Sequence, residues 1–369
     1  MARYFAMLAL LGAACWLHAQ TPKPSAAAPP PYPVVTLSFG SPQPTPLGKK
    51  GSVMLDNATC APDGTLFMEM EGISPGEWWD YALHSLTDGT EDVRYAASVA
   101  SGYQRISFPS PYYFASDDAV VTVMSAAPLE NSLEESQGTV PQEVTVALIY
   151  DRKGTLERVV PIPPKIDPQS IGMYSSGDLL VISKDASRNR LSLLVLDHDG
   201  DIKNELSLFD YDYDAKRKVG NKQPLAKDVD AAAIIQIVPD GDNLLLVPQL
   251  TQATVIEVNE QGIVRATDLK LPPGYLIRSL FPSDGPYWTV STFDHVKVLH
   301  EKTSKEGYPV FYNGPLFQFN SFDGSLVRRI NLPPKLNAKI LCVHNGEFTA
   351  MTTDKKTGHI ELLTGSVPP

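Results

Sequence analysis

The stretch "CAPDGTLFMEM" (residues 60–70) joins a Pro-Asp-Gly turn to a strand of alternating apolar residues. Glycine supplies the positive φ that a tight turn needs, and the alternation is typical of a half-buried strand. The pattern recurs in "SSGDLLVIS", "PDGDNLLLV", "SDGPYWTVS" and "HNGEFTAMT", which contain Gly177, Gly241, Gly285 and Gly346. A degenerate copy, "SDDAVVTVM", has Ala119 in place of the glycine. Repeated hairpins are therefore predicted along the whole chain.

A second family of turns alternates with the first. Its members are "YDRKGTLERVVPIPP" (150–164), "LDHDGDIKNELSLFD" (196–210), "VNEQGIVRATDLKLPP" (258–273), "NSFDGSLVRRINLPP" (320–334) and a looser "SLTDGTEDVRYAAS" (85–98). Each has an apolar strand, an Asp- or Asn-led turn closing on Gly, and an alternating strand. One turn from each family gives two hairpins, which is a four-stranded antiparallel unit of the kind that forms a propeller blade.

Five such units are complete, and the sixth ends after its third strand, "HIELL" (359–363). The segment "YPVVTLSFG" (32–40) lies before the first unit and has the alternation of a fourth strand. We therefore expect an all-β protein, a six-bladed β-propeller of four-stranded antiparallel blades, in which this N-terminal strand completes the C-terminal blade and removes its open edge. A pair of β-sandwiches with similar turns is the alternative, but it does not explain a half-unit at each end.

The "APDGTLFMEM" and Asp-led "LPP" units resemble the six-bladed propellers of the NHL-repeat and gluconolactonase-like groups, over residues 32–366. The resemblance implies an architecture rather than an activity, because one propeller fold hosts lectins, lactonases, lyases and binding scaffolds. Gluconolactonase-like enzymes hold a divalent metal in the channel with Glu, Asn and Asp. No Glu can be placed on an innermost strand here, which counts against that activity.

The composition excludes some classes of partner. The net charge is −11 and the pI is near 5.1. Nucleic-acid binding requires a basic footprint that displaces phosphate counterions, so no nucleic-acid partner is expected. An anionic membrane surface is disfavoured for the same reason.

The N-terminus is typical of an export signal. Arg3 precedes the apolar run "FAMLALLGAA" (5–14), and "LHA" (17–19) ends in a small residue suited to cleavage. Residues 1–19 are predicted to be a signal peptide and 20–31 a Pro/Ala-rich linker, so the mature protein would be periplasmic or secreted, without a transmembrane segment. "LGAAC" (11–15) resembles a lipoprotein box, and a lipid anchor on Cys15 is the alternative to cleavage after the signal.

The two remaining cysteines hold equivalent positions. Cys60 lies four residues before Gly64, and Cys342 lies four residues before Gly346. The predicted fold makes the first and last blades neighbours across the closure. A disulfide between Cys60 and Cys342 is therefore predicted, with two buried free thiols as the alternative.

Long irregular segments are predicted on the rim opposite the short hairpin turns. They are "EGISPGEWWDYAL" (71–83), "SAAPLENSLEESQGTVPQEV" (125–144), "FDYDYDAKRKVGNKQPLAKDVD" (209–230) and "FDHVKVLHEKTSKEGYPVFYNG" (293–314). Loops on a rigid scaffold usually carry binding sites, so this rim is the candidate binding face. Trp78 and Trp79 are candidates to stack on a sugar ring or a partner protein, and the alternative is that they cover the core beneath the loop.

Polar residues are predicted at the starts of the innermost strands, near the channel mouth. Asp56, Asn57, Arg278 and Lys339 are candidates for a polar funnel that takes a small anionic or sugar-like ligand. The alternative is that they are ordinary strand-start residues that face water.

No cofactor is expected. "DYDYD" (210–214) is similar to the start of a Ca²⁺ loop, but Ala215 and Asn221 depart from that pattern. A solvated acidic loop is the preferred interpretation, with Ca²⁺ as the alternative. The sequence has no metal-type His or Cys spacing, no nucleophile elbow, no P-loop and no Rossmann fingerprint.

Two functional hypotheses follow. The first is an exported, non-catalytic propeller that binds a protein, a glycan or a small ligand through its loop-rich face. The second is a metal-dependent hydrolase or lyase with its site at the central channel mouth.

Overall fold

A computed structural model of the protein describes residues 31–49, 58–72, 80–87, 90–96, 103–128, 144–185, 190–206, 235–248, 254–283, 285–300, 307–334, 336 and 338–367. The chain divides into two compact units, Met1–Pro33 and Val34–Pro369, and the second contains every strand discussed below. Within the described residues the regular structure consists of strands without helices.

The strands pair into six sheets, which we number in chain order. Sheet 1 contains β4 (Ala58–Cys60), β5 (Leu66–Gly72), β6 (Asp80–Thr87) and β7 (Thr90–Ala96). Sheet 2 contains β8 (Tyr103–Ala115), β9 (Ala119–Pro128), β10 (Val144–Asp151) and β11 (Leu156–Ile162). Sheet 3 contains β12 (Pro168–Met173), β13 (Leu179–Asp185), β14 (Arg190–Leu196) and β15 (Ile202–Leu206).

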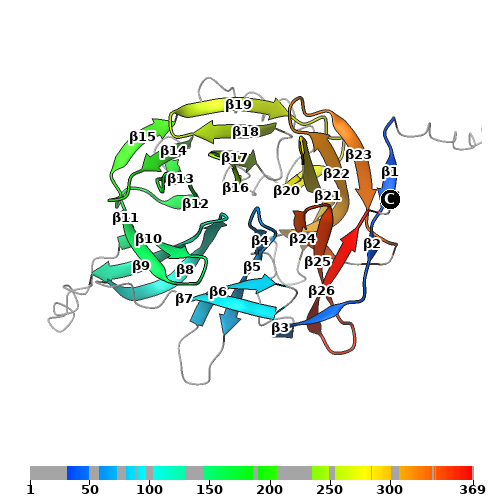
Figure 1. Cartoon of the computed structure of the whole chain (residues 1–369), viewed down its shortest axis with the longest axis horizontal. Helices are drawn as coiled ribbons and strands as arrows, with labels where there is room; N and C mark the ends of the chain where they lie inside the picture. Colours follow the sequence, from blue (N-terminus) through cyan, green and yellow to red (C-terminus); the bar gives the residue numbers. More distant parts are fainter. Residues whose placement is uncertain are drawn as a thin grey trace, which may run out of the picture. The chain divides into compact units, whose positions relative to one another are not determined.

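The C-terminal half repeats this order. Sheet 4 contains β16 (Ile235–Asp240), β17 (Asn243–Pro248), β18 (Thr254–Asn259) and β19 (Gly262–Asp268). Sheet 5 contains β20 (Leu276–Ser283), β21 (Tyr287–His300), β22 (Gly307–Asn320) and β23 (Leu326–Asn331). Sheet 6 contains β24 (Lys339–His344), β25 (Glu347–Thr353) and β26 (His359–Ser366). Strands that follow one another within a sheet are antiparallel neighbours (Figure 1).

Short turns join the first strand to the second and the third to the fourth in these sheets. We call the side on which these turns lie the turn side, and the opposite side the loop side. Most of the predicted turn glycines have positive φ; they include Gly64, Gly154, Gly177, Gly200, Gly241, Gly285, Gly324 and Gly346. Two of them also need the absence of a side chain. A Cβ on Gly200 would lie 2.1 Å from the carbonyl oxygen of Pro161, and a Cβ on Gly324 would lie 2.1 Å from that of Asp268.

The first strands of the sheets contact one another in series. β4 contacts β8, β8 contacts β12, β12 contacts β16, β16 contacts β20, β20 contacts β24, and β24 contacts β4 (Figure 1). Apolar clusters follow the same series. They join sheet 1 to 2, sheets 2, 3 and 4 to one another, sheet 4 to 5, sheet 5 to 6, and sheet 6 to 1. The fold is therefore an all-β propeller of four-stranded antiparallel sheets.

The N-terminal segment differs in part from the prediction. The expected single strand over 32–40 is divided into β1 (Val34–Thr36) and β2 (Ser38–Phe39). β1 pairs in parallel with β23 of sheet 5, whereas β2 pairs antiparallel with β26 of sheet 6. The physical reason is Leu37, which is only 2% exposed because it inserts into the apolar cluster shared by sheets 5 and 6. The chain therefore crosses from one sheet edge to the next.

The last sheet is completed by two pieces of this segment. Besides β2, the strand β3 (Gln43–Lys49) also pairs antiparallel with β26. β26 consequently has strand partners on both of its edges, β25 on one and the N-terminal pieces on the other. The open edge that the C-terminal sheet would otherwise present is thereby covered.

The cysteines lie where sheet 1 meets sheet 6. Cys60 ends β4 and Cys342 lies within β24, at a sequence separation of 282. Their Cα atoms are 5.2 Å apart, and the two sulfur atoms are bonded in this structure. That Cα separation lies within the range that disulfides adopt. The ring of the neighbouring His344 packs against Gly64, so that a Cβ added there would lie 2.7 Å from it.

Candidate functional site

The structure describes two of the predicted site residues. Arg278 lies on β20 and Lys339 begins β24, and both side chains are partly buried. β20 and β24 are the first strands of sheets 5 and 6, and they contact one another. Both residues therefore lie near the loop-side starts of adjacent inner strands.

The other predicted positions fall outside the described residues. These are Asp56, Asn57, Trp78, Trp79, the acidic stretch 210–214 and Cys15. Whether the four site residues among them join Arg278 and Lys339 is left as a prediction.

Arg278 is held by two neighbouring strands of its own sheet. Its guanidinium carbon lies 5.1 Å from the centre of the Phe293 ring on β21. One of its terminal nitrogens donates a hydrogen bond to Oδ1 of Asn313 on β22. A guanidinium that stacks on an aromatic ring keeps its N–H donors in the plane of the group, at its edge. The arrangement fixes the direction in which Arg278 presents its charge.

The pairing of β21 with β22 is irregular at this place. The register shifts between Ser291 and Phe293 and again between Phe293 and His295. A Cβ on Gly314 would lie 2.5 Å from Oγ1 of Thr292, so that the two strands approach too closely here for any side chain. The Thr292 hydroxyl, 1% exposed as a residue, donates to the carbonyl oxygen of Pro315 at 2.7 Å. Such irregularities change the direction in which side chains point, and they are frequent beside functional sites.

The inner wall next to Arg278 is tied to the preceding sheet. The Gln236 amide on β16 accepts from the Leu280 N–H at 2.9 Å and donates to the Leu280 carbonyl at 3.3 Å. These two hydrogen bonds join β16 of sheet 4 to β20 of sheet 5, as main-chain hydrogen bonds join paired strands. They fix β20 two residues beyond Arg278, which makes the site part of the rigid scaffold.

The chemistry of the described residues favours binding of an anion. A guanidinium offers five N–H donors in a fork that matches a carboxylate or a phosphate, and an ammonium offers a compact positive charge. Within the described part of the chain there is no group of three or more His, Cys, Asp or Glu side chains arranged to hold a metal ion. Arg278 and Lys339 thus define the candidate site by charge and hydrogen-bond donors.

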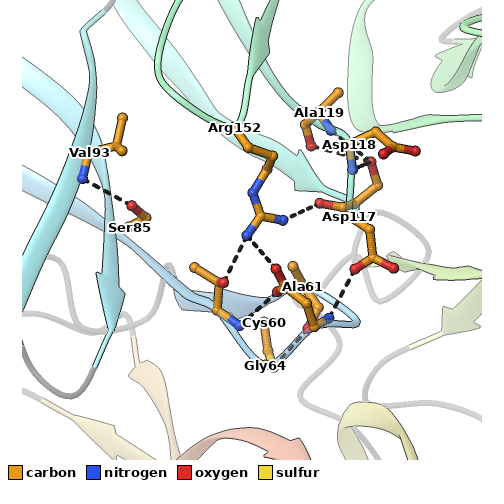
Figure 2. A network of polar contacts seen from close by, with 12 residues as sticks. Cys60, Ala61, Gly64, Ser85, Val93, Asp117, Asp118, Ala119 and Arg152 are labelled. Atoms are coloured by element: carbon orange, nitrogen blue, oxygen red, sulfur yellow. Dashed lines mark hydrogen bonds and ion pairs between the residues drawn. The ribbon is translucent and has the colours of Figure 1, made fainter.

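Sequence reasoning missed a polar network on the turn side, centred on Arg152 in the β10–β11 turn. A terminal nitrogen of Arg152 lies 2.8 Å from both Oδ2 of Asp63 and Oγ1 of Thr65 in the β4–β5 turn, and the other contacts the carbonyl oxygen of Ser116. Figure 2 shows Arg152 reaching towards the turn that contains Cys60, Ala61 and Gly64. Its guanidinium also lies 5.0 Å from the centre of the Phe67 ring. Arg152 therefore joins sheet 2 to sheet 1.

The backbone of the same turn is also fixed. The Tyr95 hydroxyl donates to the Arg152 carbonyl oxygen at 2.8 Å, and burial raises the pKa of Tyr95. The partners of Arg152 are distant in sequence, so only their shared Asp-led turn pattern could have indicated them. The network is structural, because its donors and acceptors satisfy one another.

A second such network joins sheets 3 and 4. The Asp178 carboxylate, with a side chain only 4% exposed, pairs with the ammonium of Lys203 on β15. Lys203 also lies 3.0 Å from Oε2 of Glu260 in the β18–β19 turn of sheet 4. Hydrogen bonds to Asp178 and Glu260 raise the pKa of Lys203, and a hydrogen bond from Ser176, followed by one from Lys203, lowers the pKa of Glu260. This group also acts as a link between sheets.

Comparison with known proteins gives structural similarities at low sequence identity. No protein-family model and no curated protein matches the chain. A solved GH74 xyloglucanase from Xanthomonas campestris is similar at 13% identity and a TM-score of 0.42, over 89% of this chain and 46% of that one. A DUF4221-family member from Bacteroides vulgatus is similar at 7% identity and a TM-score of 0.44, over 90% of this chain and 98% of that one.

The chain thus spans less than half the length of the xyloglucanase. At this level of similarity neither structure informs on the activity of this protein. Within the described residues, no helix is long and apolar enough to span a membrane.

Proposed function

We propose that the protein is an exported six-bladed propeller that binds a protein or a glycan through its loop side and performs no catalysis. Six blades are supported by the six sheets whose first strands contact one another in a closed series. The likeness to NHL-repeat and gluconolactonase-like propellers enters this proposal only as a likeness of repeat pattern. Export is supported by the signal-like pattern of residues 1–19, and a lipid on Cys15 is its alternative.

The observation that carries the binding proposal is the placement of Arg278. Its guanidinium is stacked on Phe293 and bonded to Asn313, near the start of β20 and therefore on the loop side. A positive group held in one orientation needs little ordering when a ligand arrives, which favours affinity. Lys339, at the start of the adjacent inner strand, adds a second positive charge in a chain of net charge −11. The ligand class is therefore an acidic one, either a carboxylate-bearing glycan or an acidic protein segment.

Isothermal titration calorimetry on residues 20–369 tests this proposal. The probes are an oligogalacturonate and a neutral galactan oligomer of the same length. We expect the acidic oligomer to bind, and Arg278→Ala to weaken its binding by about tenfold or more, since a charge-assisted hydrogen bond contributes roughly 1.5–3 kcal/mol.

Lys165→Ala is the matched control, because it removes one exposed positive charge from the β11–β12 link on the same side of the molecule. Equal affinity for the neutral oligomer, or an equal loss in Lys165→Ala, would contradict the assignment of Arg278. Binding of neither oligomer would leave the acidic protein segment as the ligand and would exclude the glycan.

The alternative function is a metal-dependent hydrolase or lyase at the channel mouth, with Ca²⁺ as the candidate ion. It is distinguished by the thermal unfolding midpoint of the mature protein in EDTA and in Ca²⁺, because an ion that binds the folded state raises that midpoint. A midpoint that is the same in both conditions excludes the Ca²⁺ enzyme.

A further inference from the structure

Exposed apolar side chains are concentrated on the turn side of sheets 3, 4 and 5. Among the described side chains, the large exposed apolar ones include Ile202 (53% exposed), Val264 (49%) and Phe322 (79%). Ile202 begins β15, Val264 lies on β19, and Phe322 lies in the β22–β23 turn. These are corresponding regions of three consecutive sheets, at the turn ends of their outer strands. We call the three residues the rim stripe.

Contacts between the sheets bring the regions that carry the rim stripe against one another. Asn204, two residues after Ile202, donates to the Glu260 carbonyl oxygen at 2.9 Å, which places β15 against the β18–β19 turn. Arg265, next to Val264, has its guanidinium carbon 5.5 Å from the centre of the Phe322 ring. Each outer strand thus lies against the turn of the following sheet. The exposed apolar groups consequently succeed one another along the rim.

The backbone of the Phe322 turn is fixed, although the Phe322 side chain is exposed. The Phe322 N–H donates to Oδ1 of Asn320 at 2.8 Å, and the following Gly324 N–H donates to the Asn320 carbonyl at 3.0 Å. The turn is also fixed to sheet 4, because the Lys270 N–H donates to the Gly324 carbonyl at 2.9 Å. An exposed aromatic ring on a fixed turn requires little ordering of the backbone on binding, which suits the aromatic anchors of protein interfaces.

The charges that border the rim stripe favour a basic partner. Lys203 is paired with Asp178 and Glu260, and Arg265 lies 2.8 Å from Oε2 of Glu257. These two positive groups are therefore already paired with carboxylates of the protein, whereas Lys270 on the same rim is exposed and lies close enough to Asp323 to contribute, after hydrogen bonds from Ser325, to lowering its pKa. Further carboxylates are exposed along the same rim, at Asp199, Asp201, Glu205 and Asp323. Hydrogen bonds from Ser325 lower the pKa of Asp323, so this carboxylate carries its negative charge at neutral pH.

We propose that the rim stripe is a second binding surface, which takes a basic amphipathic segment of a partner protein. Apolar side chains of the segment would cover Val264 and Phe322, and its positive side chains would meet the bordering carboxylates. The surface lies on the turn side, opposite the Arg278 site. The proposal is thus independent of the acidic ligand on the loop side, and it would make the propeller a bridge between two partners.

Fluorescence anisotropy with two labelled peptides tests this surface. One peptide alternates leucine with lysine, and the other alternates leucine with glutamate. We expect the leucine–lysine peptide to bind, and Val264→Ser and Phe322→Ser each to weaken its binding, by about tenfold for Phe322→Ser. Val34→Ser is the matched control because Val34 is 45% exposed on β1, opposite Arg329 of β23, and is not part of the rim stripe, so we expect it to leave binding unchanged.

Three results would overturn the proposal. The first is unchanged affinity in both rim-stripe variants. The second is equal binding of the leucine–glutamate peptide. The third is a dimer of the wild-type protein, in sedimentation velocity, that Phe322→Ser dissociates, because the stripe would then join two copies of this chain. If Phe322→Ser lowers the thermal unfolding midpoint, the peptide affinity of Val264→Ser alone decides between the outcomes, since the Val264 side chain takes no part in the Phe322 turn.

Discussion

At the residue scale, several junctions between neighbouring sheets are bridged by a single arginine side chain. Arg152 bonds to Asp63 and Thr65 of sheet 1, and the Arg158 guanidinium donates to the Gly177 carbonyl of sheet 3 at 2.7 Å. Arg265 of sheet 4 stacks near Trp288 and Phe322 of sheet 5. A planar fork of donors with an apolar stem suits this task, because it spans a gap and satisfies several acceptors at once.

The Arg152 network yields a stability prediction. Arg152→Ala removes hydrogen bonds to Asp63, Thr65 and Ser116 and leaves these acceptors without that partner. We expect the free energy of unfolding to fall by about 2 kcal/mol, as measured by urea denaturation. Lys153→Ala, at the exposed neighbouring position, is the control and should change it by less than about 0.5 kcal/mol. Equal effects of the two substitutions would show that the network contributes nothing specific.

At the element scale, the third and fourth strands share one irregularity. In sheets 1 to 5 the register between them shifts close to the turn, at Leu86, Tyr150, Leu196, Val258 and Phe319. On the fourth strand, the first residue that pairs on the side of the shift away from the turn is Arg158 in sheet 2, Asn204 in sheet 3, Arg265 in sheet 4 and Arg328 in sheet 5. In sheets 2, 3 and 4 this residue, Arg158, Asn204 or Arg265, contacts the next sheet, so the repeat there extends from the turn glycines to the residues that join the sheets.

Sequence patterns predicted the hairpins well because their determinants are local. Glycine at a fixed place in the turn and alternation in the following strand are both readable within ten or so residues. The division of the N-terminal strand was not predictable in that way. It depends on the parallel pairing of Val34–Thr36 with β23 and on the burial of Leu37, which are contacts across almost the whole chain. The partners of Arg152 and the stacking of Arg278 on Phe293 were not predicted either, because they also depend on contacts between residues that are not close in the sequence.

The close approach of β21 and β22 yields a prediction at this scale. Gly314→Ala would place a methyl group 2.5 Å from Oγ1 of Thr292 and 3.1 Å from the Asp294 nitrogen. We expect the free energy of unfolding to fall by about 1–3 kcal/mol, and oligogalacturonate binding to weaken, because Asn313 moves with its neighbour.

Gly40→Ala is the matched control for Gly314→Ala. The nearest atom to its added Cβ is the Thr364 carbonyl oxygen at 3.6 Å, an ordinary contact distance. Urea denaturation and calorimetry should show it to be nearly neutral in both respects. A Gly314→Ala protein with wild-type stability and affinity would show that the irregular pairing has no part in shaping the site.

At the scale of the whole molecule, the closure between sheet 6 and sheet 1 is the feature on which the ring depends. The apolar cluster there contains Leu66, Met68, Leu341, Met351, Ile360 and Leu362. Among the described side chains it is much smaller than the cluster shared by sheets 2, 3 and 4. The covalent link between Cys60 and Cys342 lies at this junction. A bond between residues so distant in the chain restricts the unfolded state strongly.

Peptide mapping of the non-reduced protein, residues 20–369, by mass spectrometry tests this closure most directly. We expect one linked peptide pair that contains Cys60 and Cys342, and its loss on treatment with a dithiol reductant. We also expect the Cys60→Ser/Cys342→Ser protein to lose roughly 2–5 kcal/mol of unfolding free energy. Alkylation of both cysteines in the denatured protein, without prior reduction, would contradict the covalent closure between the first and last sheets.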